Sequence, residues 1–356
     1  MLKKLTLIIL ILLFSACSWL NPTIKVVLIG NFQDSGRDFS VSSFSGVELA
    51  IKQLKLDDRI EIDAIDIAKY DNEEDLEQAM IDSEATIFIG PNNSSDLTLV
   101  YPIIERNEFF AFIPTASSDD INVKDDYVFR FITSTTEQAL QFSNLLKDKD
   151  YHHILILYEN ANLAYTQVLA QGIQRTIPNR VTSTEYVDYN TTQEMLESYL
   201  STQIDAIVLI ASAQSSGVLV QRMRLAHVDL PIYLSSWAQS QTLMDYVAKA
   251  TENMYIYSNG FPTHMDHYQS LNMSYHEVYG EDIGLPALYS YEFIHILKSY
   301  LDLGHRVNKQ DFKDYLVENP LQDGYLFNLE LNEFGLGQQA MQLLEIQDGL
   351  FVKSDH

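Results

Sequence analysis

The sequence predicts an α/β protein in two halves, each with a parallel sheet covered by helices. Short apolar runs without helical spacing alternate with segments whose apolar residues recur at helical intervals, which is the pattern of a doubly wound sheet. After a break near residue 127 the alternation resumes with a similar rhythm. The 356 residues, of which 46% are hydrophobic and 20% charged, are enough for two domains of ordinary size.

The first half alternates from residue 24 to residue 113. Strands are predicted at residues 24–29, 60–67, 85–89 and 109–113, and helices at residues 46–54, 69–83 and from 96 onward. Residues 30–45 are rich in Ser, Asp and Gly, so we expect a polar loop before the first helix. The strand at 85–89 stops at Gly90-Pro91, a pair that breaks regular structure.

The second half begins with an extended segment at residues 127–132. Strands are predicted at residues 154–158, 181–186, 206–210, 232–234 and 254–257, and helices at residues 136–146, 165–176, 192–202 and 218–226. Further helices are predicted at residues 265–279, 287–303 and 312–318. Residues 324–331 and 339–346 alternate like the two strands of a final hairpin.

Residues 87–118 place hydroxyl groups in two turns that follow neighbouring strands. Their sequence is IFIGPNNSSDLTLVYPIIERNEFFAFIPTASS. In an open parallel sheet both turns lie at the carboxyl ends of the strands, where α/β proteins bind ligands, and the N-terminus of the helix between them favours an anionic group. We therefore expect these turns to form one wall of a small-molecule cleft.

The N-terminus has the features of a signal peptide at residues 1–16. Lys3 and Lys4 precede an apolar run over residues 5–14, which is shorter than the roughly 20 residues of a membrane-spanning helix. Cys17, the only cysteine, follows small residues and resembles the lipidated cysteine of a bacterial lipobox. We expect Cys17 to carry a lipid that anchors the mature chain to a membrane, with residues 17–23 as a spacer. The alternative is an uncleaved membrane anchor.

Composition and motifs argue against several other functions. The formal charge of −26 would repel a nucleic-acid backbone, so no nucleic acid is expected as a partner. The sequence holds no G-x-S-x-G elbow, Walker loop or H-E-x-x-H pair, so we predict no catalytic residue, no cofactor and no enzyme. His264 and His267 have H-x-x-H spacing without a further ligand nearby, which favours a solvated helix face over a metal site.

Four segments resemble the type I extracytoplasmic substrate-binding proteins of ABC transporters, specifically the branched-chain amino-acid (Leu/Ile/Val) receptor family. They are IKVVLIGNFQDSGRDFSVSSFSGVELAIKQL, IFIGPNNSSDLTLVYPIIERNEFFAFIPTASSDDI, DYVFRFITSTTEQALQFSNLL and LILYENANLAYTQVLAQGI. The resemblance implies the periplasmic binding protein type I fold, with two Rossmann-like lobes, a ligand cleft between them and about three hinge crossovers. We assign residues 24–135 and 259–325 to lobe 1, and residues 136–258 and 326–356 to lobe 2.

The resemblance also implies ligand contacts in the first lobe. In this family the ligand carboxylate is held by a serine of the GPxxSS turn and by groups after the next strand, which implies Ser94 or Ser95 together with Thr115 and Ser117. Phe39 matches an aromatic position of the first loop. A helix cap alone also explains the Ser-Ser pair, and the two roles are compatible.

In the second lobe the resemblance implies contacts from Tyr165, Ser212 and Trp237. Tyr165 matches an aromatic position, and Ser212 a position that is often aromatic. The family's acidic partner for a ligand ammonium should fall in the turn at residues 235–238, which reads Ser-Ser-Trp-Ala and has no carboxylate. Trp237 offers an aromatic face that suits a cation-π contact or an apolar ligand. Core packing of Tyr165 and a hinge contact by Trp237 are the alternatives.

These expectations describe an extracytoplasmic, membrane-anchored lipoprotein that binds a small molecule. It would capture a small polar or amphipathic ligand, such as an amino acid or a related carboxylate or amide, and deliver it as a monomer to an ABC permease. The alternative is an envelope lipoprotein that regulates peptidoglycan synthesis and uses the same two-lobe module to bind a protein partner.

Overall fold

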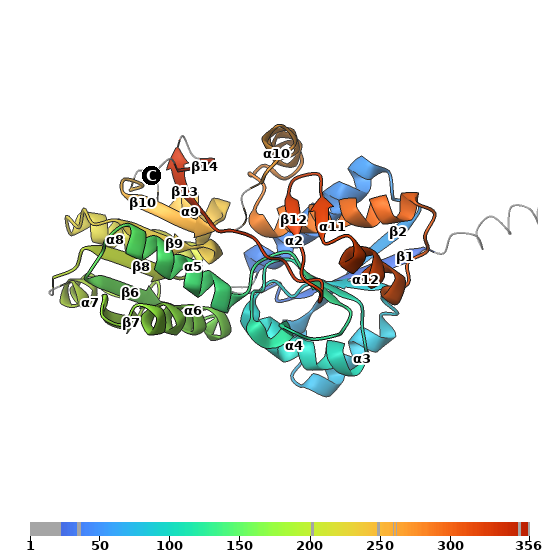
Figure 1. Ribbon diagram of the computed structural model, residues 1–356, viewed down its shortest axis with the longest axis horizontal. Helices are drawn as coiled ribbons and strands as arrows, with labels where there is room; N and C mark the ends of the chain where they lie inside the picture. Colours follow the sequence, from blue (N-terminus) through green and yellow to red (C-terminus); the bar gives the residue numbers. More distant parts are fainter. Residues whose placement is uncertain are drawn as a thin grey trace, which may run out of the picture.

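The computed structural model describes residues 23–33, 37–200, 203–247, 250–258, 260, 262–347 and 350–354, without the side chains of 321–323. The predicted signal peptide, Cys17 and the spacer up to residue 22 lie outside the described residues. The described chain forms two lobes side by side, each built on its own sheet (Figure 1).

The first lobe contains a five-stranded sheet in which every neighbouring pair is parallel, in the order β2-β1-β3-β4-β5. Its strands are β1 (Ile24–Gly30), β2 (Ile60–Asp66), β3 (Ile87–Ile89), β4 (Ala111–Ile113) and β5 (Val128–Arg130). Adjacent residues of β1 enter different cores, since Val26 and Leu28 pack on one face and Val27 and Ile29 on the other. This burial of both faces explains why the strand is a continuous apolar run.

Helices from both ends of the chain cover this sheet. They are α2 (Arg37–Leu54), α3 (Glu73–Asp82) and α4 (Ser94–Arg106), and, from the tail, α10 (Met265–Tyr279), α11 (Leu285–Asp302) and α12 (Lys309–Glu318). Helix α11 packs along α2, and a Cβ at Gly46 would lie 2.4 Å from the carbonyl oxygen of Ala287. Only glycine allows the two backbones to approach so closely.

The second lobe contains a seven-stranded mixed sheet in the order β14-β13-β10-β9-β8-β6-β7. Its parallel strands are β6 (Ile154–Tyr158), β7 (Val181–Tyr186), β8 (Ala206–Ile210), β9 (Ile232–Ser235) and β10 (Met254–Ser258). Two antiparallel strands, β13 (Gln342–Gln347) and β14 (Leu350–Lys353), complete it. Its helices are α5 (Thr135–Asp148), α6 (Leu163–Thr176), α7 (Gln193–Tyr199), α8 (Ala213–Leu225), the short η4 (Ser236–Ala238) and α9 (Gln241–Val247).

The chain passes between the lobes after β5, after β10 and before β13 (Figure 1). The core of the first lobe includes Leu326, Phe327, Leu331 and Leu336. Met341 packs in the core of the second lobe. We therefore propose that the last crossing lies at residues 337–341, later than the predicted boundary after residue 325.

Two local predictions were wrong. Helix α2 begins at Arg37 rather than Gly46, so much of the predicted polar loop is helical. Its buried serines depend on tertiary partners, because the Ser43 and Ser290 hydroxyls share a hydrogen bond of 2.7 Å between α2 and α11. The predicted final hairpin does not form either: β12 (Asn328–Glu330) pairs with β11 (Leu321–Asp323), and β13 pairs with β10 and β14.

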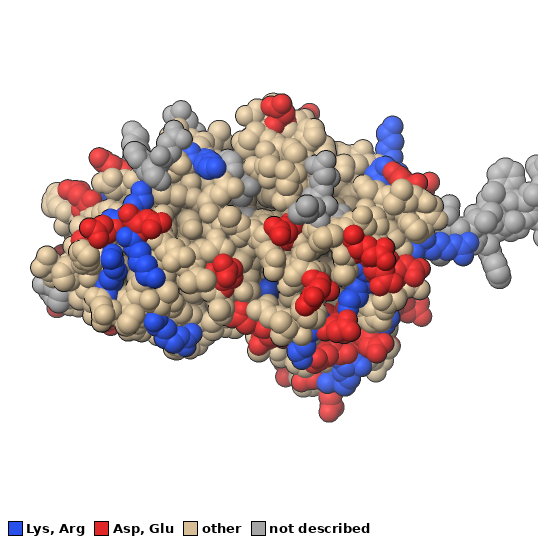
Figure 2. Space-filling model, in the orientation of Figure 1, with Lys and Arg blue, Asp and Glu red and all other residues tan. Residues whose placement is uncertain are grey.

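Acidic side chains are unevenly spread over the face in Figure 2. They gather over the part of the first lobe where Figure 1 shows α3 and α4, with few basic groups among them. Arg106, the last residue of α4, forms ion pairs with Glu73 and Glu77 of α3 at 3.0 and 2.7 Å. The acidic surface over α3 and α4 (Figure 2) would repel a nucleic-acid backbone.

Candidate ligand-binding site between the lobes

Six of the predicted site residues surround one small cavity between the lobes. Phe39, Ser94, Thr115 and Ser117 come from the first lobe, and Tyr165 and Trp237 from the second. The cavity has a volume of about 20 Å³, which is room for a single water molecule. The lobes are therefore closed on each other, and a larger ligand requires them to separate.

The first-lobe wall consists of the turns after β3 and β4, which their hydroxyl groups tie together. The Ser117 N–H donates to Ser94 Oγ at 3.2 Å, and the Thr115 hydroxyl donates to the carbonyl oxygen of Asn92 at 3.0 Å. The Ser117 and Thr135 hydroxyls lie 2.9 Å apart, which connects this wall to the start of α5. These hydroxyls thus hold the wall together and line the cavity at once.

The N-termini of α4 and α6 meet across the cleft, where each is capped by the other lobe. The Ser95 N–H donates to Asn162 Oδ1 at 3.0 Å, and the Ala164 N–H donates to Ser95 Oγ at 3.4 Å. The residues that precede the two helices, Asn93 and Asn162, make no side-chain cap to their own helices. Ser95 therefore caps α6 rather than α4, which differs from the simple cap considered from the sequence.

Sequence reasoning missed Asn162, although an asparagine just before a helix is a typical capping residue. Asn162 is only 3% exposed, and it also lines the central cavity. The two facing helix N-termini concentrate partial positive charge at this point of the cleft. Such an arrangement favours an anionic ligand group.

Tyr165 and Trp237 form the second-lobe wall, and both also pack in its core together with Phe39 from the first lobe. The Tyr165 hydroxyl lies 3.3 Å from Gln138 Oε1 and 3.4 Å from Ser236 Oγ. Burial raises the pKa of Tyr165, so the phenol stays a neutral donor at physiological pH. Core packing and cavity lining are therefore combined in these aromatic residues.

Ser212 does not reach the central cavity. Its hydroxyl accepts from the Ser215 N–H at 3.4 Å and so caps α8, while its own N–H donates to Glu159 Oε2 at 2.7 Å. Ser212 lines a neighbouring, larger cleft of about 620 Å³, which shares Phe39 and Trp237 with the central cavity.

This larger cleft is acidic, because Asp38, Glu159 and Asp188 contribute to its lining. Glu159, at the end of β6, is only 5% exposed and also accepts from the Ser215 hydroxyl at 2.8 Å. The sequence signal was a carboxylate directly after a buried strand, and it was overlooked. The cleft therefore has carboxylates, although the turn at residues 235–238 has none.

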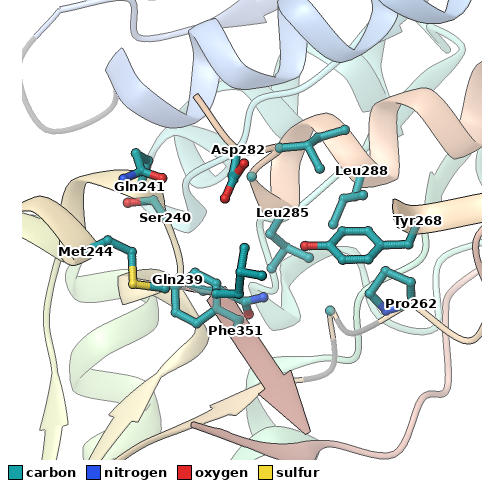
Figure 3. A pocket seen from close by; sticks show the side chains of 14 residues that line it. Gln239, Ser240, Gln241, Met244, Pro262, Tyr268, Asp282, Leu285, Leu288 and Phe351 are labelled. Carbon is teal, nitrogen blue, oxygen red and sulfur yellow. The ribbon is translucent and has the colours of Figure 1, made fainter. Parts of the chain in front are cut away.

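A further cavity of about 20 Å³ lies beside the central one, between the same two lobes (Figure 3). Gln239 and Phe351 face it from the second lobe, and Tyr268 and Leu285 from the first, with Leu285 also lining the central cavity. Burial and the charge of Asp282 raise the pKa of Tyr268 to about 12. The interface between the closed lobes thus extends beyond the central cavity.

The two histidines of the H-x-x-H pair have other partners. His264 Nε2 lies 3.1 Å from Asn328 Oδ1, and His267 Nδ1 lies 2.8 Å from the carbonyl oxygen of Tyr325. Within the described ranges no group of three or more His, Cys, Asp or Glu side chains could hold a metal ion.

The sequence from residue 23 to residue 349 matches the model of a family described as periplasmic binding protein. The chain belongs to this periplasmic binding protein family. That assignment confirms the predicted type I family and its two-lobed α/β fold, and the family is one of binding proteins rather than enzymes. No curated protein matches the chain.

Solved structures of other periplasmic binding proteins have the same fold. The branched-chain amino acid transporter substrate binding protein LivJ from Streptococcus pneumoniae, in complex with isoleucine, has a TM-score of 0.80 and 18% identity, covering 94% of this chain and all (100%) of that one. A solute binding protein from R. palustris, in complex with benzoate, has a TM-score of 0.80 and 14% sequence identity, and the match covers 93% of this chain and 95% of that one. The leucine binding protein LivK from Thermotoga maritima has a TM-score of 0.77 and 12% identity, and the match covers 93% of this chain and 98% of that one.

The family is extracytoplasmic, as predicted. In the part of the chain that the structure describes, no helix combines the length and the apolar character that crossing a membrane requires.

Proposed function

We propose that this periplasmic binding protein is a lipid-anchored solute receptor, which encloses a small carboxylate-bearing molecule between its lobes and delivers it to an ABC permease. The main support is the meeting of the α4 and α6 N-termini at the cleft. A ligand carboxylate that enters between the lobes would replace Asn162 Oδ1 and Ser95 Oγ as the acceptor of the two backbone N–H groups. The hydroxyls of Ser94 and Ser117 lie beside this point as further donors.

The aromatic lining supports an apolar body for the ligand. Phe39, Tyr165 and Trp237 all line the cavity and are almost fully buried. Isoleucine and benzoate, found in two of the similar structures, each combine one carboxylate with an apolar body. A ligand of this amphipathic kind suits the combination of helix N-termini and aromatic rings.

A ligand ammonium would need a partner other than the turn at residues 235–238. Burying an α-ammonium without a carboxylate is costly. A ligand without an ammonium group avoids this cost, and one with a longer cationic arm would direct it toward Asp38 and Glu159 in the larger cleft. We therefore favour a carboxylate or amide without an α-ammonium over the branched-chain amino acids themselves.

The membrane side of the proposal depends on Cys17, which lies outside the described residues. A lipid on Cys17 would hold the mature protein near its permease, and a single copy of the chain contains both walls of the cleft, which supports a monomer. Stable anchoring requires more than one acyl chain.

A thermal-shift screen of small carboxylates, amides and amino acids on the mature protein tests the proposal. A ligand at one hundred times its Kd stabilises the folded state by about 2.7 kcal/mol. The double variant Ser94→Ala, Ser117→Ala should weaken binding of any hit, whereas Ser270→Ala, at an exposed serine of α10, should not. If no compound raises the Tm, the regulator of peptidoglycan synthesis that binds a protein partner becomes the better proposal.

A further inference from the structure

A separate cavity lies at the hinge, away from the cleft between the lobes. It has a volume of about 540 Å³, which is within the usual range of small-molecule sites, about 300–1,000 Å³. Arg130 lines it from the end of β5, Thr133 from the first crossover, and Gly337 and Gln339 from the last. It shares no lining residue with the central cavity.

Arg130, the last residue of β5, is a buried cation at this cavity and is only 1% exposed. Its Nη1 donates to the carbonyl oxygen of Ser118 at 2.6 Å, and its Nη2 donates to Asn122 Oδ1 at 2.8 Å. Among the described residues its Nε–H has no hydrogen-bond partner, and no carboxylate lies within ion-pair distance of the guanidinium. A guanidinium has five N–H donors, so most of its donor capacity is unused.

Burial lowers the pKa of Arg130 to about 10, with the charge of Asp119 opposing the shift. Asp119 is occupied elsewhere, because its carboxylate accepts from Asn122 Nδ2 at 2.8 Å and from the Thr136 hydroxyl at 2.6 Å. A buried charge without a counter-ion is costly, and an anion at the guanidinium would remove that cost.

Gln339 supplies a second unused donor. Its Nε2 is buried and, within the described ranges, has no hydrogen-bond partner. Its position is fixed, since Gln339 N donates to Thr133 Oγ1 at 2.9 Å, and Gln339 Oε1 accepts from the Tyr289 hydroxyl at 3.2 Å. The acidic residue in the described lining is Glu137, which is exposed and accepts from Gln141 Nε2 at 3.2 Å.

We propose that the hinge cavity binds a small organic carboxylate, which pairs with the Arg130 guanidinium and accepts a hydrogen bond from Gln339 Nε2. Guanidinium and carboxylate groups are geometrically matched, and their charge-assisted hydrogen bonds are strong where water is excluded. Because both crossovers line the cavity, a carboxylate bound there contacts the segments that move when the lobes open. Its binding is thereby coupled to the open and closed states of the lobes.

Calorimetric titration of the mature protein with butyrate at constant ionic strength tests this site, with butyramide as the uncharged control. Because butyrate also fits the proposed cleft, the hinge site is measured in the cleft variant Ser94→Ala, Ser117→Ala. There we expect saturable 1:1 binding of butyrate and at least about tenfold weaker binding of butyramide, which corresponds to about 1.4 kcal/mol. Gln339→Leu should weaken butyrate binding by about three- to tenfold through the loss of one hydrogen bond. Arg130→Met should abolish it, and if that variant does not fold, Gln339→Leu alone decides.

Comparison of the cleft variant with the unsubstituted protein separates this site from the proposed receptor cleft. Saturable butyrate binding that remains in the cleft variant supports the hinge site. Loss of binding in the cleft variant with retention in Gln339→Leu overturns the hinge proposal but leaves the receptor proposal intact. Absence of saturable binding, or equal affinity for butyrate and butyramide, also overturns it.

Discussion

The reciprocal capping of α4 and α6 predicts that Asn162→Ala loosens the closed arrangement of the lobes. The substitution removes the oxygen that accepts from the Ser95 N–H at 3.0 Å, so this N–H loses its partner in the opposite lobe. The contact exists only while the lobes are closed. The variant should therefore shift the equilibrium toward the open form and leave the fold of each lobe unchanged.

The size of the effect follows from the geometry. Removal of a capping side chain typically costs about 1 kcal/mol, which changes an equilibrium by about fivefold. The reverse contact, from the Ala164 N–H to Ser95 Oγ, is 3.4 Å long and exceeds the usual range of about 2.7–3.2 Å. Ser95→Ala should therefore have a smaller effect than Asn162→Ala.

Amide hydrogen exchange measures the shift toward the open form directly, because opening of the lobes exposes the Ser95 and Ala164 amides. In Asn162→Ala the Ser95 amide should exchange about fivefold faster, and Ser270→Ala should leave it unchanged. Faster exchange in α6 alone, with no change at Ser95, would refute the capping of α4 by the other lobe.

Three further predictions concern packing, pH and anchoring. Gly46→Ala places a Cβ 2.4 Å from the Ala287 carbonyl oxygen and should lower the free energy of unfolding, measured with denaturant, by about 1–3 kcal/mol. Helix propensity alone would instead predict a gain in stability, and such a gain would contradict the close approach of the two helices. Burial raises the pKa of Asp96 to about 6. Between about pH 4 and pH 6 the folded state therefore keeps a proton that the unfolded chain has lost. The free energy of unfolding falls as the pH rises through this range. Asp96→Asn should accordingly raise the Tm at pH 7 and leave it nearly unchanged at pH 4, and an equal change at both pH values would count against the assignment. Cys17→Ala should move the protein from the membrane to the soluble fraction, while continued anchoring would indicate an uncleaved N-terminal helix.

The central strands of both sheets were predictable because they are buried on both faces. A strand such as β8 is fully buried, so its sequence is a continuous apolar run that needs no knowledge of its neighbours. The start of α2 was not predictable in this way. Ser40 and Ser43 favour turns when judged locally, but both are buried within a helix, where the Ser43 and Ser290 hydroxyls share a hydrogen bond.

Similar limits apply to the candidate site. The turns that contain Ser94 and Ser117 were recognisable, because hydroxyl-rich turns after neighbouring strands meet at one sheet edge. The resemblance implied a ligand contact for Ser212, and in the structure its hydroxyl caps α8 while the residue lines the larger cleft. The unused donors of Arg130 and Gln339 gave no signal in the sequence, since a residue's lack of a partner depends on everything packed around it.

The sequence by itself determined the family, the alternation of strands and helices and the residue types in the turns that face the cleft. Only the tertiary structure decided which group each polar side chain contacts. Ser95 and Asn162 are 67 residues apart, and they meet because the two lobes close on each other. Local spacing specifies which face of a helix or strand is buried, but hydrogen-bond partners in different lobes depend on the distances that closure creates.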